Sequence, residues 1–427
     1  MSESCNSRHF SWLVKSCLPN SQDTTNALTP IPLHSPTTTA PTTLSALPDD
    51  LLLECLSRVP SSSLPSLSLV CRRWSHIVHS STFVSLRRIR HFHSSTLFAL
   101  SSSDSVLFTA SLNFKHNDHS TTHDDSNILG DWKVSTFITL QAPSLIDNLS
   151  HARLSSIGPR IYIVERHGVL CYDTWTHSLT LRSSMNFRRK KFACAVVSSK
   201  IYVAGGGGSR APAALVEEYD PERDTWSVVA HAPRRRFGCI GAAVDGVFYV
   251  IGGLKIGGAS ETEVPRAAAT GTEYASTMDL YDVKTRAWLR SRTVPGGGCA
   301  VAACATAAGF VYVLASHAVE MSFWRFDGRR QNGGAGFGEW TRIKSPPLPP
   351  QVRVDSTVRF SCVASEEKVV VVQVNGCIDD LLRRSGRNRR GMREGLVLVY
   401  DTVGGEWSRG PDLPEVIRRA ACVSVEC

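Results

Sequence analysis

The stretch that decides the fold is IYVAGGGGSRAPAALVEEYDPERDTW, residues 201–226. It begins with a short run of β-branched and aromatic residues that ends in glycines. An aromatic-Asp pair follows at Tyr219-Asp220, and a tryptophan stands seven residues after the tyrosine, at Trp226. β-Branched and aromatic residues favour strands, and glycine clusters mark where strands end. The stretch therefore predicts short strands joined by turns rather than a helix.

The same pattern recurs along most of the chain. The strand-like runs are IYIVERHG (161–168), IYVAGGGG (201–208), FYVIGGLK (248–255), VYVLASHA (311–318) and VVVVQVNG (369–376). The aromatic-Asp pairs begin at Tyr172, Tyr219, Tyr281, Phe326 and Tyr400, and the units end at Leu179, Trp226, Trp288, Trp340 and Trp407. These spacings suit four short strands per unit, the period of a β-propeller blade. We expect each tryptophan to fill the gap toward the next blade.

The two ends of the repeat region each hold an incomplete unit. Residues 415–427 match the strand that opens each unit, and residues 97–135 look like later strands without an opening one. If the two ends complete one sheet, no open edge remains between the first and last blades. We therefore predict a mainly β fold, a six-bladed propeller over residues 91–427 that the C-terminal strand closes. Its units lie at about 136–182, 183–229, 230–291, 292–343 and 344–410, and its sixth blade comes from 97–135 plus 415–427.

A helical pattern precedes the repeats. In LPDDLLLECLSRVP (47–60), Leu52, Leu56 and Val59 recur at helical spacing, with Pro48 and two aspartates where a first turn favours them. A second helical pattern runs from Leu67 to Val78. About 45 residues cannot bury much core, so this unit should lean on a neighbour or a partner. Residues 1–43, rich in Thr, Pro and Ser, are expected to be a disordered leader.

Both regions resemble known families. Residues 44–90 resemble a small all-α F-box, on Leu47-Pro48-Asp49-Asp50-Leu51-Leu52 and Leu69-Val70-Cys71-Arg72-Arg73-Trp74. The repeats look like kelch repeats, with glycine doublets at Gly205-Gly206 and Gly252-Gly253, and the order is that of plant-type F-box/kelch proteins. The resemblance implies the substrate-recognition subunit of an SCF-type cullin-RING ubiquitin ligase. It implies that the F-box binds the Skp-type adaptor, and through it the cullin and RING subunits. The propeller is implied to bind the protein to be ubiquitinated and degraded.

The resemblance also implies site residues and a class of target. It assigns adaptor binding to Leu47, Pro48, Leu51, Leu52, Leu56, Val70, Cys71 and Trp74. The alternative for Leu56, Val70 and Trp74 is that they form internal core of the helical unit. Some plant members of the family recognise enzymes of phenylpropanoid and flavonoid synthesis, so such an enzyme is a candidate target. The alternative function is a kelch interaction scaffold that acts outside a ubiquitin ligase.

Arginine clusters stand where the chain enters the inner strands, so they should crowd one rim of the ring. The target-binding candidates are Arg188, Arg189, Arg234, Arg235, Arg236 and Arg418. Three interpretations are open: a surface for an acidic partner, inward arginines that form hydrogen bonds, or solvated loops. The basic run at 381–390 is favoured as an exposed loop over a nuclear localisation signal.

No catalytic or cofactor motif is recognisable, and the sequence predicts that the protein is not an enzyme and has no metal or cofactor. Five cysteines open inner strands, at Cys194, Cys239, Cys299, Cys362 and Cys422, and are favoured as small apolar filler over a thiol ring. The histidines at 116, 119 and 123 are favoured as part of a polar loop. A copper site of a kelch-type oxidase is not present in the sequence.

Composition limits the partners and the compartment. The net charge of +9 over 427 residues is too small to indicate nucleic-acid binding, and we expect neither a nucleic-acid nor a membrane partner. The N-terminus lacks the apolar core of a signal peptide. Thirteen cysteines without a C-x-x-C pair fit a reducing compartment, so we expect a cytoplasmic and/or nuclear protein.

Overall fold

The structure is a computed structural model. It describes residues 44–92, 94–103, 106–114, 130–137, 149, 152–166, 168–207, 214–255, 276–295, 300–316, 321–329, 338–348, 358–365, 367–376, 395–417 and 419–426. From Asp49 onward these residues belong to one compact unit, separate from the stretch that ends at Pro48. The leader expected over 1–43, the polar histidine loop and the basic run at 381–390 lie outside the described residues.

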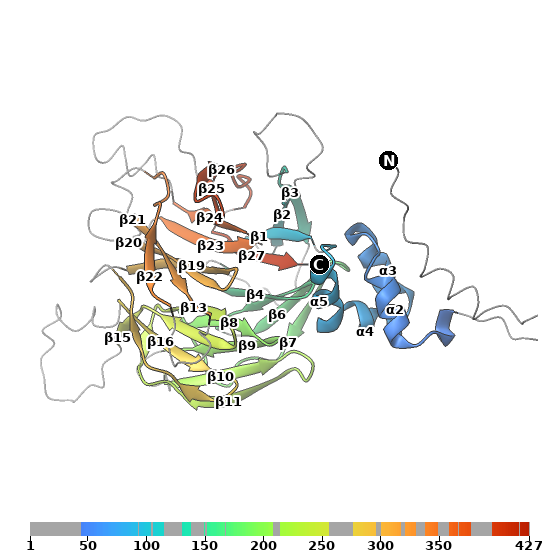
Figure 1. Ribbon diagram of the computed structural model, residues 1–427, viewed down its shortest axis with the longest axis horizontal. Coiled ribbons are helices and arrows are strands. Elements are labelled where there is room, and N and C mark those ends of the chain that lie inside the picture. Colours follow the sequence, from blue (N-terminus) through green and yellow to red (C-terminus); the bar gives the residue numbers. More distant parts are fainter. Residues whose placement is uncertain are drawn as a thin grey trace, which may run out of the picture. The chain divides into compact units, whose positions relative to one another are not determined.

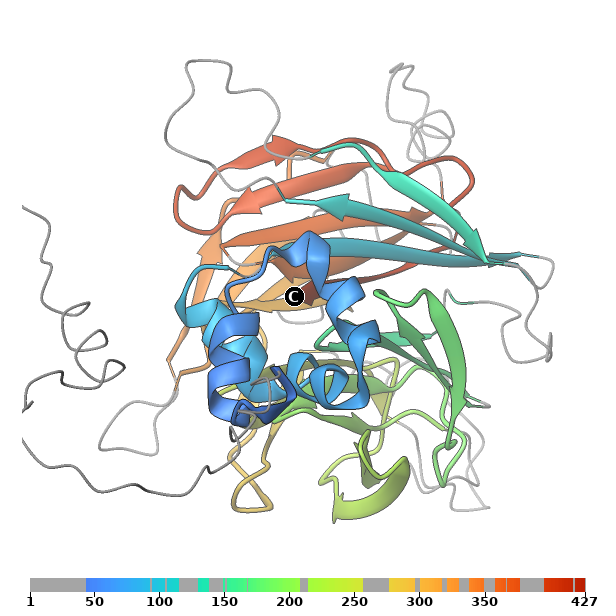
Figure 2. The same ribbon diagram turned by 90° about the vertical axis from the view of Figure 1, so that its right-hand side faces the viewer.

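Four short α-helices precede the sheets (Figure 2, blue). They are α2 (Asp49–Leu56), α3 (Leu64–Val70), α4 (Arg72–Val78) and α5 (Ser81–Ile89), with 3₁₀ turns η1 (Leu44–Ala46) and η2 (Ser61–Ser63). Two aspartates occupy the first turn of α2, where the helix dipole stabilises negative charge. We call α2 to α5, residues 49–92, the helical unit. No helix among the described residues is both long enough and apolar enough to cross a membrane.

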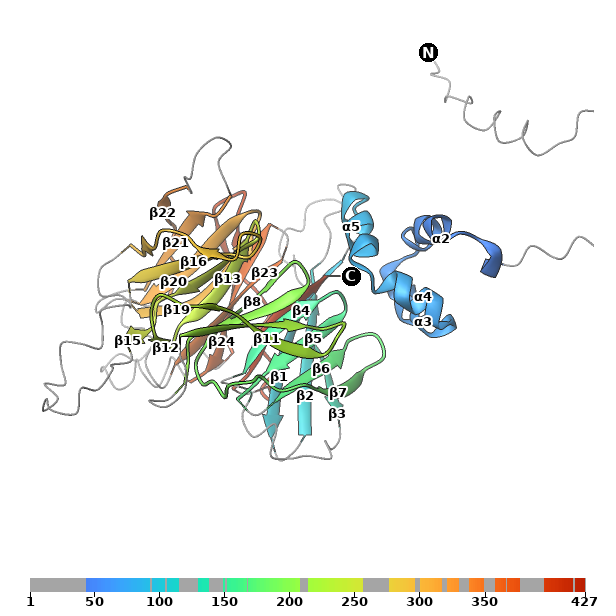
Figure 3. The same ribbon diagram turned by 90° about the horizontal axis from the view of Figure 1, so that it is seen from below.

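The strands after the helical unit form six principal antiparallel sheets. The first holds β4 (Arg153–Ile157), β5 (Arg160–Val164), β6 (Val169–Asp173) and β7 (Ser178–Arg182); the second holds β8 (Ala193–Val197), β9 (Lys200–Ala204), β10 (Leu215–Asp220) and β11 (Thr225–His231). The third holds β13 (Ile240–Val244), β14 (Val247–Ile251), β16 (Thr277–Asp282) and β17 (Ala287–Trp288), with β18 (Arg292–Thr293) also paired to β16. In Figure 3, β4 to β7 follow one another outward across the first sheet.

The remaining sheets follow the same plan. The fourth holds β19 (Ala300–Ala307), β20 (Phe310–Ser316), β21 (Met321–Asp327) and β22 (Trp340–Ile343); the fifth holds β23 (Arg359–Ser365), β24 (Lys368–Asn375), β25 (Val397–Asp401) and β26 (Trp407–Arg409). The sixth takes β27 (Ala421–Glu426) from the C-terminus with β1 (Ser95–Ser103), β2 (Val106–Asn113) and β3 (Lys133–Phe137). A small ribbon pairs β12 (Arg236–Phe237) with β15 (Leu254–Lys255).

The innermost strands of these sheets contact one another in a closed cycle. β4 contacts β8, and the contacts continue through β13, β19, β23 and β27 back to β4. The fold is therefore a six-bladed β-propeller, as the repeat pattern predicted. Apolar side chains of facing sheets fill the spaces between adjacent blades, so each blade depends on both of its neighbours.

The ring closes through β27, which pairs with β1 from Ser95↔Glu426 to Leu100↔Ala421. Figure 1 shows the red β27 beside the teal β1. The buried side chains of Val423 and Val425 pack with Ile161 and Ile163 of the first blade. The predicted closure of the ring by the C-terminal strand is confirmed.

The aromatic markers of the repeat lie opposite one another in the outer half of each blade. Tyr219 pairs with Trp226 across β10 and β11, and their ring centroids are 5.0 Å apart. The Tyr219 ring packs on Tyr162 of the preceding blade with centroids 5.9 Å apart, Trp226 belongs to the same apolar cluster, and its Nε1 donates to the Ser183 carbonyl at 2.9 Å. The expectation that the tryptophan faces the next blade was therefore wrong. The paired tyrosine and tryptophan share one face of the sheet, and that face packs on the preceding blade.

The aspartate of each aromatic-Asp pair closes the turn between the two outer strands. Asp173 Oδ1 accepts hydrogen bonds from the backbone N–H groups of Trp175 and Thr176, at 3.0 and 3.1 Å. Asp220, Asp282 and Asp401 accept the corresponding pairs of bonds in their own blades. A carboxylate that bonds the backbone two residues ahead stabilises such a turn, which explains why the pair recurs.

Deleting residues 421–427 should open the ring. It removes the innermost strand of the sixth blade, including the buried side chains of Val423 and Val425. β1 then keeps β2 on one side but has an unpaired inner edge. We expect the melting temperature to fall by about 10 °C or more, measured by differential scanning calorimetry. The exposed Val416 supplies the control, because Val416→Asp should melt like the parent. Equal melting of the truncated chain and the control would contradict closure by β27.

Candidate functional site

The helical unit has a small core of its own. Leu52 and Leu56 of α2 are 1% and 4% exposed, and they share the interior with Leu64, Ile77, Val78 and Phe83. Both leucines were expected to contact an adaptor, and their burial instead makes them internal core. For Leu56 the sequence had left open that the side chain forms internal core, and its burial supports that interpretation.

A buried arginine, which sequence reasoning missed, holds the helical unit together. Arg87 of α5 donates from Nη1 to the carbonyls of Ser57 and Val59, at 3.0 and 2.6 Å, and from Nη2 to Ser61 Oγ at 2.8 Å. These carbonyls lie just beyond the end of α2, where a helix leaves acceptors unsatisfied. Arg87 therefore links α5 to the C-terminal end of α2.

Several apolar side chains of the helical unit remain in solvent. Leu51 on α2 is 51% exposed and Val70 at the end of α3 is 59% exposed. Leu69 and Cys71 beside Val70 are also exposed, and Trp74 on α4 is half-buried. We call these five residues the exposed apolar set. Leu69 was missed by the sequence analysis, although it adjoins Val70. In the separate stretch before α2, Leu47 is half-buried and Pro48 is exposed.

Ion pairs hold the helices that carry this set. Arg73 Nε of α4 donates to Asp49 Oδ1 of α2 at 2.7 Å. Glu54 of α2 accepts hydrogen bonds from Arg90 and Arg58. These bonds lower the pKa of the Glu54 carboxyl, and the bond from Arg90 has the largest effect. Such exposed pairs add little stability individually; the Arg73–Asp49 pair joins α4 to α2, and the Arg90–Glu54 pair joins the end of α5 to α2.

The end of α4 contacts the turn between β6 and β7. His79 Nδ1 lies 2.6 Å from the Ser75 carbonyl, and Nε2 lies 3.6 Å from Asp173 Oδ2. The His79 ring also packs on Trp175, with centroids 4.9 Å apart. Burial acts to raise the pKa of the Asp173 carboxyl, but the nearby His79 ring and the backbone N–H groups of Thr176 and Trp175 outweigh it and hold that pKa well below its usual value. These contacts fix the helical unit to the first blade.

Two of the predicted target-binding arginines are core residues of the propeller. Arg189 is 2% exposed; its Nε donates to Glu217 Oε2 at 2.9 Å and its Nη1 to the Gly205 carbonyl at 2.8 Å. Arg236 is 1% exposed and repeats the arrangement one blade later, with Asp279 Oδ2 and the Gly252 carbonyl, both at 2.8 Å. Neither side chain reaches the rim, so the inward interpretation holds for both.

The glycine doublets make these arginine sites possible. Gly205 and Gly206 have φ of +71° and +69°, and a Cβ on Gly205 would lie 2.9 Å from the Arg236 carbonyl oxygen. Only glycine combines that backbone with so close an approach. The signal that sequence reasoning missed is the acid two residues before the blade tyrosine: Glu217 before Tyr219 and Asp279 before Tyr281.

The other target-binding candidates that the structure describes are either exposed to solvent or hydrogen-bonded to neighbouring side chains. Arg188 and Arg235 are exposed, as is Lys190. Arg234 is half-buried and bonds Asp279 and Ser291. Arg418 lies outside the described residues. The exposed basic side chains therefore come from the loops ahead of β8 and β13, and we call Arg188, Lys190 and Arg235 the basic rim.

The inner-strand cysteines line the centre of the ring only in part. Cys194, Cys362 and Cys422 line a central cavity together with Cys304, which had not been singled out. Cys239 is buried beside it, and Cys299 lies outside the described residues. Burial raises the pKa of Cys194 to about 11 and of Cys304 and Cys422 to about 12. These thiols are neutral at neutral pH, as apolar filler requires.

Comparisons with known proteins match both parts of the chain. Residues 44–86 match the model of the F-box domain, and residues 188–233 match that of the Kelch motif. An F-box/kelch-repeat protein of Arabidopsis thaliana is 61% identical over 432 residues, covering 100% of both chains. A second one from the same plant is 29% identical over 218 residues, covering 49% of this chain and 54% of its own. The solved structure of YjhT is 16% identical with a TM-score of 0.46, and the match covers 62% of this chain and 84% of that one.

Removing the Arg236 guanidinium should destabilise the propeller. In Arg236→Leu the buried Asp279 loses one of its two cations and keeps only the half-buried Arg234, and we expect the free energy of unfolding in urea to fall by about 3 kcal/mol. The exposed neighbour is the control: Arg235→Leu should stay within about 0.5 kcal/mol of the parent. The double variant Arg236→Leu/Asp279→Leu should recover part of the loss. If Arg236→Leu loses no more stability than Arg235→Leu, the Arg236 side chain is solvated at the rim and is not part of the core.

Proposed function

Since the chain belongs to the F-box/kelch-repeat proteins, we propose that it is the substrate-recognition subunit of an SCF-type cullin-RING ubiquitin ligase. The observation that carries the proposal is the full-length match to an F-box/kelch-repeat protein at 61% identity, which includes both the helical unit and the propeller. The family pairs an F-box, which implies binding to a Skp-type adaptor, with a propeller that binds a protein target. It is an adaptor-type rather than an enzymatic family.

The exposed apolar set supports adaptor binding. Leu51, Leu69 and Val70 are large aliphatic side chains in water, and burying each against a partner contributes about 1.5–3 kcal/mol. Clusters of exposed apolar side chains on a small unit mark protein-protein contacts. The expected adaptor residues that remain available for contact are Leu47, Pro48, Leu51, Val70, Cys71 and Trp74, to which we add Leu69.

In this proposal the propeller positions the target protein and catalyses no reaction itself. When one molecule binds both the adaptor and a target, ubiquitin transfer to that target becomes effectively intramolecular. A stiff connection between the two binding parts raises the effective concentration most, because less motion has to be restricted. The contacts of His79 with Asp173 and Trp175 supply such a connection between the helical unit and the first blade.

We place target binding on the basic rim. Arg188, Lys190 and Arg235 project from loops held by the buried Arg189 and Arg236, so the rim is both charged and well positioned. Rigid scaffolds use such loops for recognition, and positive charge favours an acidic surface. Enzymes of phenylpropanoid and flavonoid synthesis are the first targets to test. We place the protein in the cytoplasm and/or nucleus, in keeping with the free thiols of all the described cysteines.

Charge on the exposed apolar set should abolish adaptor binding. The double variant Leu51→Asp/Val70→Asp places carboxylates where a partner would bury leucine and valine, and we expect the affinity for the Skp-type adaptor to fall about 100-fold or more. Calorimetric titration of the purified adaptor measures it. Val403→Asp, at an exposed position on the propeller, is the control and should bind like the parent. Parent-like adaptor affinity of the double variant would refute this surface.

Charge reversal on the basic rim should separate target capture from adaptor binding. We expect Arg188→Glu/Arg235→Glu to reduce the recovery of captured target proteins at least about tenfold at 0.15 M salt, with adaptor affinity unchanged. Quantitative mass spectrometry of purified complexes gives both values. The control Arg188→Lys/Arg235→Lys keeps both positive charges and should capture targets almost as the parent does. Full capture by the glutamate variant would place the target elsewhere on the propeller.

A further inference from the structure

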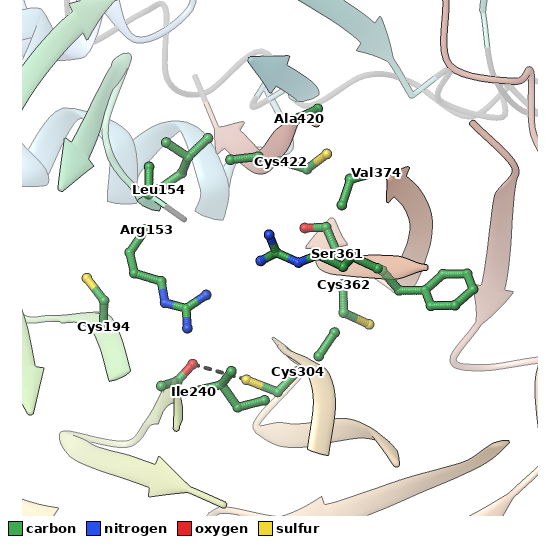
Figure 4. A pocket seen from close by; sticks show the side chains of 16 residues that line it. Arg153, Leu154, Cys194, Ile240, Cys304, Ser361, Cys362, Val374, Ala420 and Cys422 are labelled. Atoms are coloured by element: carbon green, nitrogen blue, oxygen red, sulfur yellow. Dashed lines mark hydrogen bonds between the residues drawn. The ribbon is translucent and has the colours of Figure 1, made fainter. Parts of the chain in front are cut away.

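The innermost strands of the propeller enclose a cavity of about 160 Å³. Figure 4 shows its lining, to which the six inner strands or the residues just before them contribute. Leu154, Ile240 and Val374 give it apolar walls, the inner-strand cysteines add neutral thiols, and Ser361 adds a hydroxyl. A water molecule takes up about 30 Å³ in the liquid, so the space suits a small molecule rather than a peptide.

Two arginines line this otherwise neutral cavity. Arg153 is the first residue of β4 and Arg359 the first residue of β23, so they come from non-adjacent blades. The Arg153 guanidinium projects into the space in Figure 4. Among the described residues, Arg153 donates only to backbone carbonyls, from Nε to Phe192 at 2.8 Å and from Nη2 to Cys239 at 3.2 Å. Burial lowers the pKa of Arg359, and the positive charge of Arg153 lowers it further.

These arginines differ from the other inward arginines of the propeller. Arg189 and Arg236 each meet a buried carboxylate, Glu217 and Asp279. By contrast, no described residue of the cavity lining is an Asp or Glu, and neither Arg153 nor Arg359 takes part in any ion pair between described residues. Arg153 and Arg359 are both half-buried, so water screens their like charges only in part, and an anion between them would relieve the repulsion. The half-buried pair is therefore suited to receive negative charge.

We propose that this cavity binds a small organic anion, with its carboxylate or phosphate between Arg153 and Arg359 and its hydrocarbon part against the apolar wall. Guanidinium groups pair with both oxyanions through two parallel hydrogen bonds. Ser361 can donate a further bond from its hydroxyl. Such a ligand joins the first and fifth blades from inside the ring, so its binding stabilises the propeller. The proposal does not depend on adaptor or target binding.

Melting of the full chain tests the proposal with benzoate and phenyl phosphate as probes. Each is added at 10 mM, with sodium chloride at matched ionic strength and neutral benzamide as controls. We expect one or both anions to raise the melting temperature by about 3 °C or more, and the controls to leave it unchanged. A response to benzoate alone identifies a carboxylate site, and a response to phenyl phosphate alone identifies a phosphate site.

Variants at Arg359 separate a ligand site from a structural arginine. Without ligand, Arg359→Leu should melt at or above the parent's temperature, because it removes charge repulsion, and it should lose the response to both anions. Arg359→Lys keeps the charge and should keep part of the response, and the exposed Arg223→Leu should respond as the parent does. The proposal fails if neither anion raises the melting temperature above chloride, if Arg359→Leu keeps the response, or if Arg359→Leu melts well below the parent without ligand.

Discussion

The pairing of β27 with β1 is the constraint on which the rest of the structure depends. Each blade buries one face against the preceding blade and the other against the next, so no sheet is complete until the ring is closed. Because the C-terminal strand supplies the innermost strand of the sixth blade, closure also completes the wall of the central cavity.

Three buried arginines are provided with acceptors from the protein, whereas two half-buried arginines of the central cavity meet no carboxylate among the described residues. Arg87 satisfies carbonyls beyond the end of α2, whereas Arg189 and Arg236 meet carboxylates and the carbonyls of the glycine doublets. Each of these cations gains stabilising partners when it leaves water. Arg153 and Arg359 enter the cavity without a described carboxylate, which is why we assign them a ligand rather than a structural role.

The sequence was sufficient for the architecture and less so for the binding surfaces. The aromatic-Asp pairs and tryptophans recur because each blade needs the same turn and the same packing contact, so the period predicted six blades and their closure. Whether Leu52 faces the core or a partner depends on how α2 packs on the other helices, which an apolar pattern does not determine. The arginines Arg189 and Arg188 are adjacent in sequence, and only the acid at Glu217 distinguishes the inward one. Arg153 and Arg359 meet across some two hundred residues, beyond the reach of any local pattern.

The central claim is that one molecule of this chain holds an adaptor and a target at the same time, which an interaction scaffold outside a ligase would not do. Sequential purification tests it most directly, first through a tag on the Skp-type adaptor and then through a tag on this chain, with the proteasome blocked. The account predicts that proteins captured by the propeller are present in the second eluate and carry ubiquitin. Captured proteins confined to the adaptor-free fraction, without ubiquitin, would contradict it.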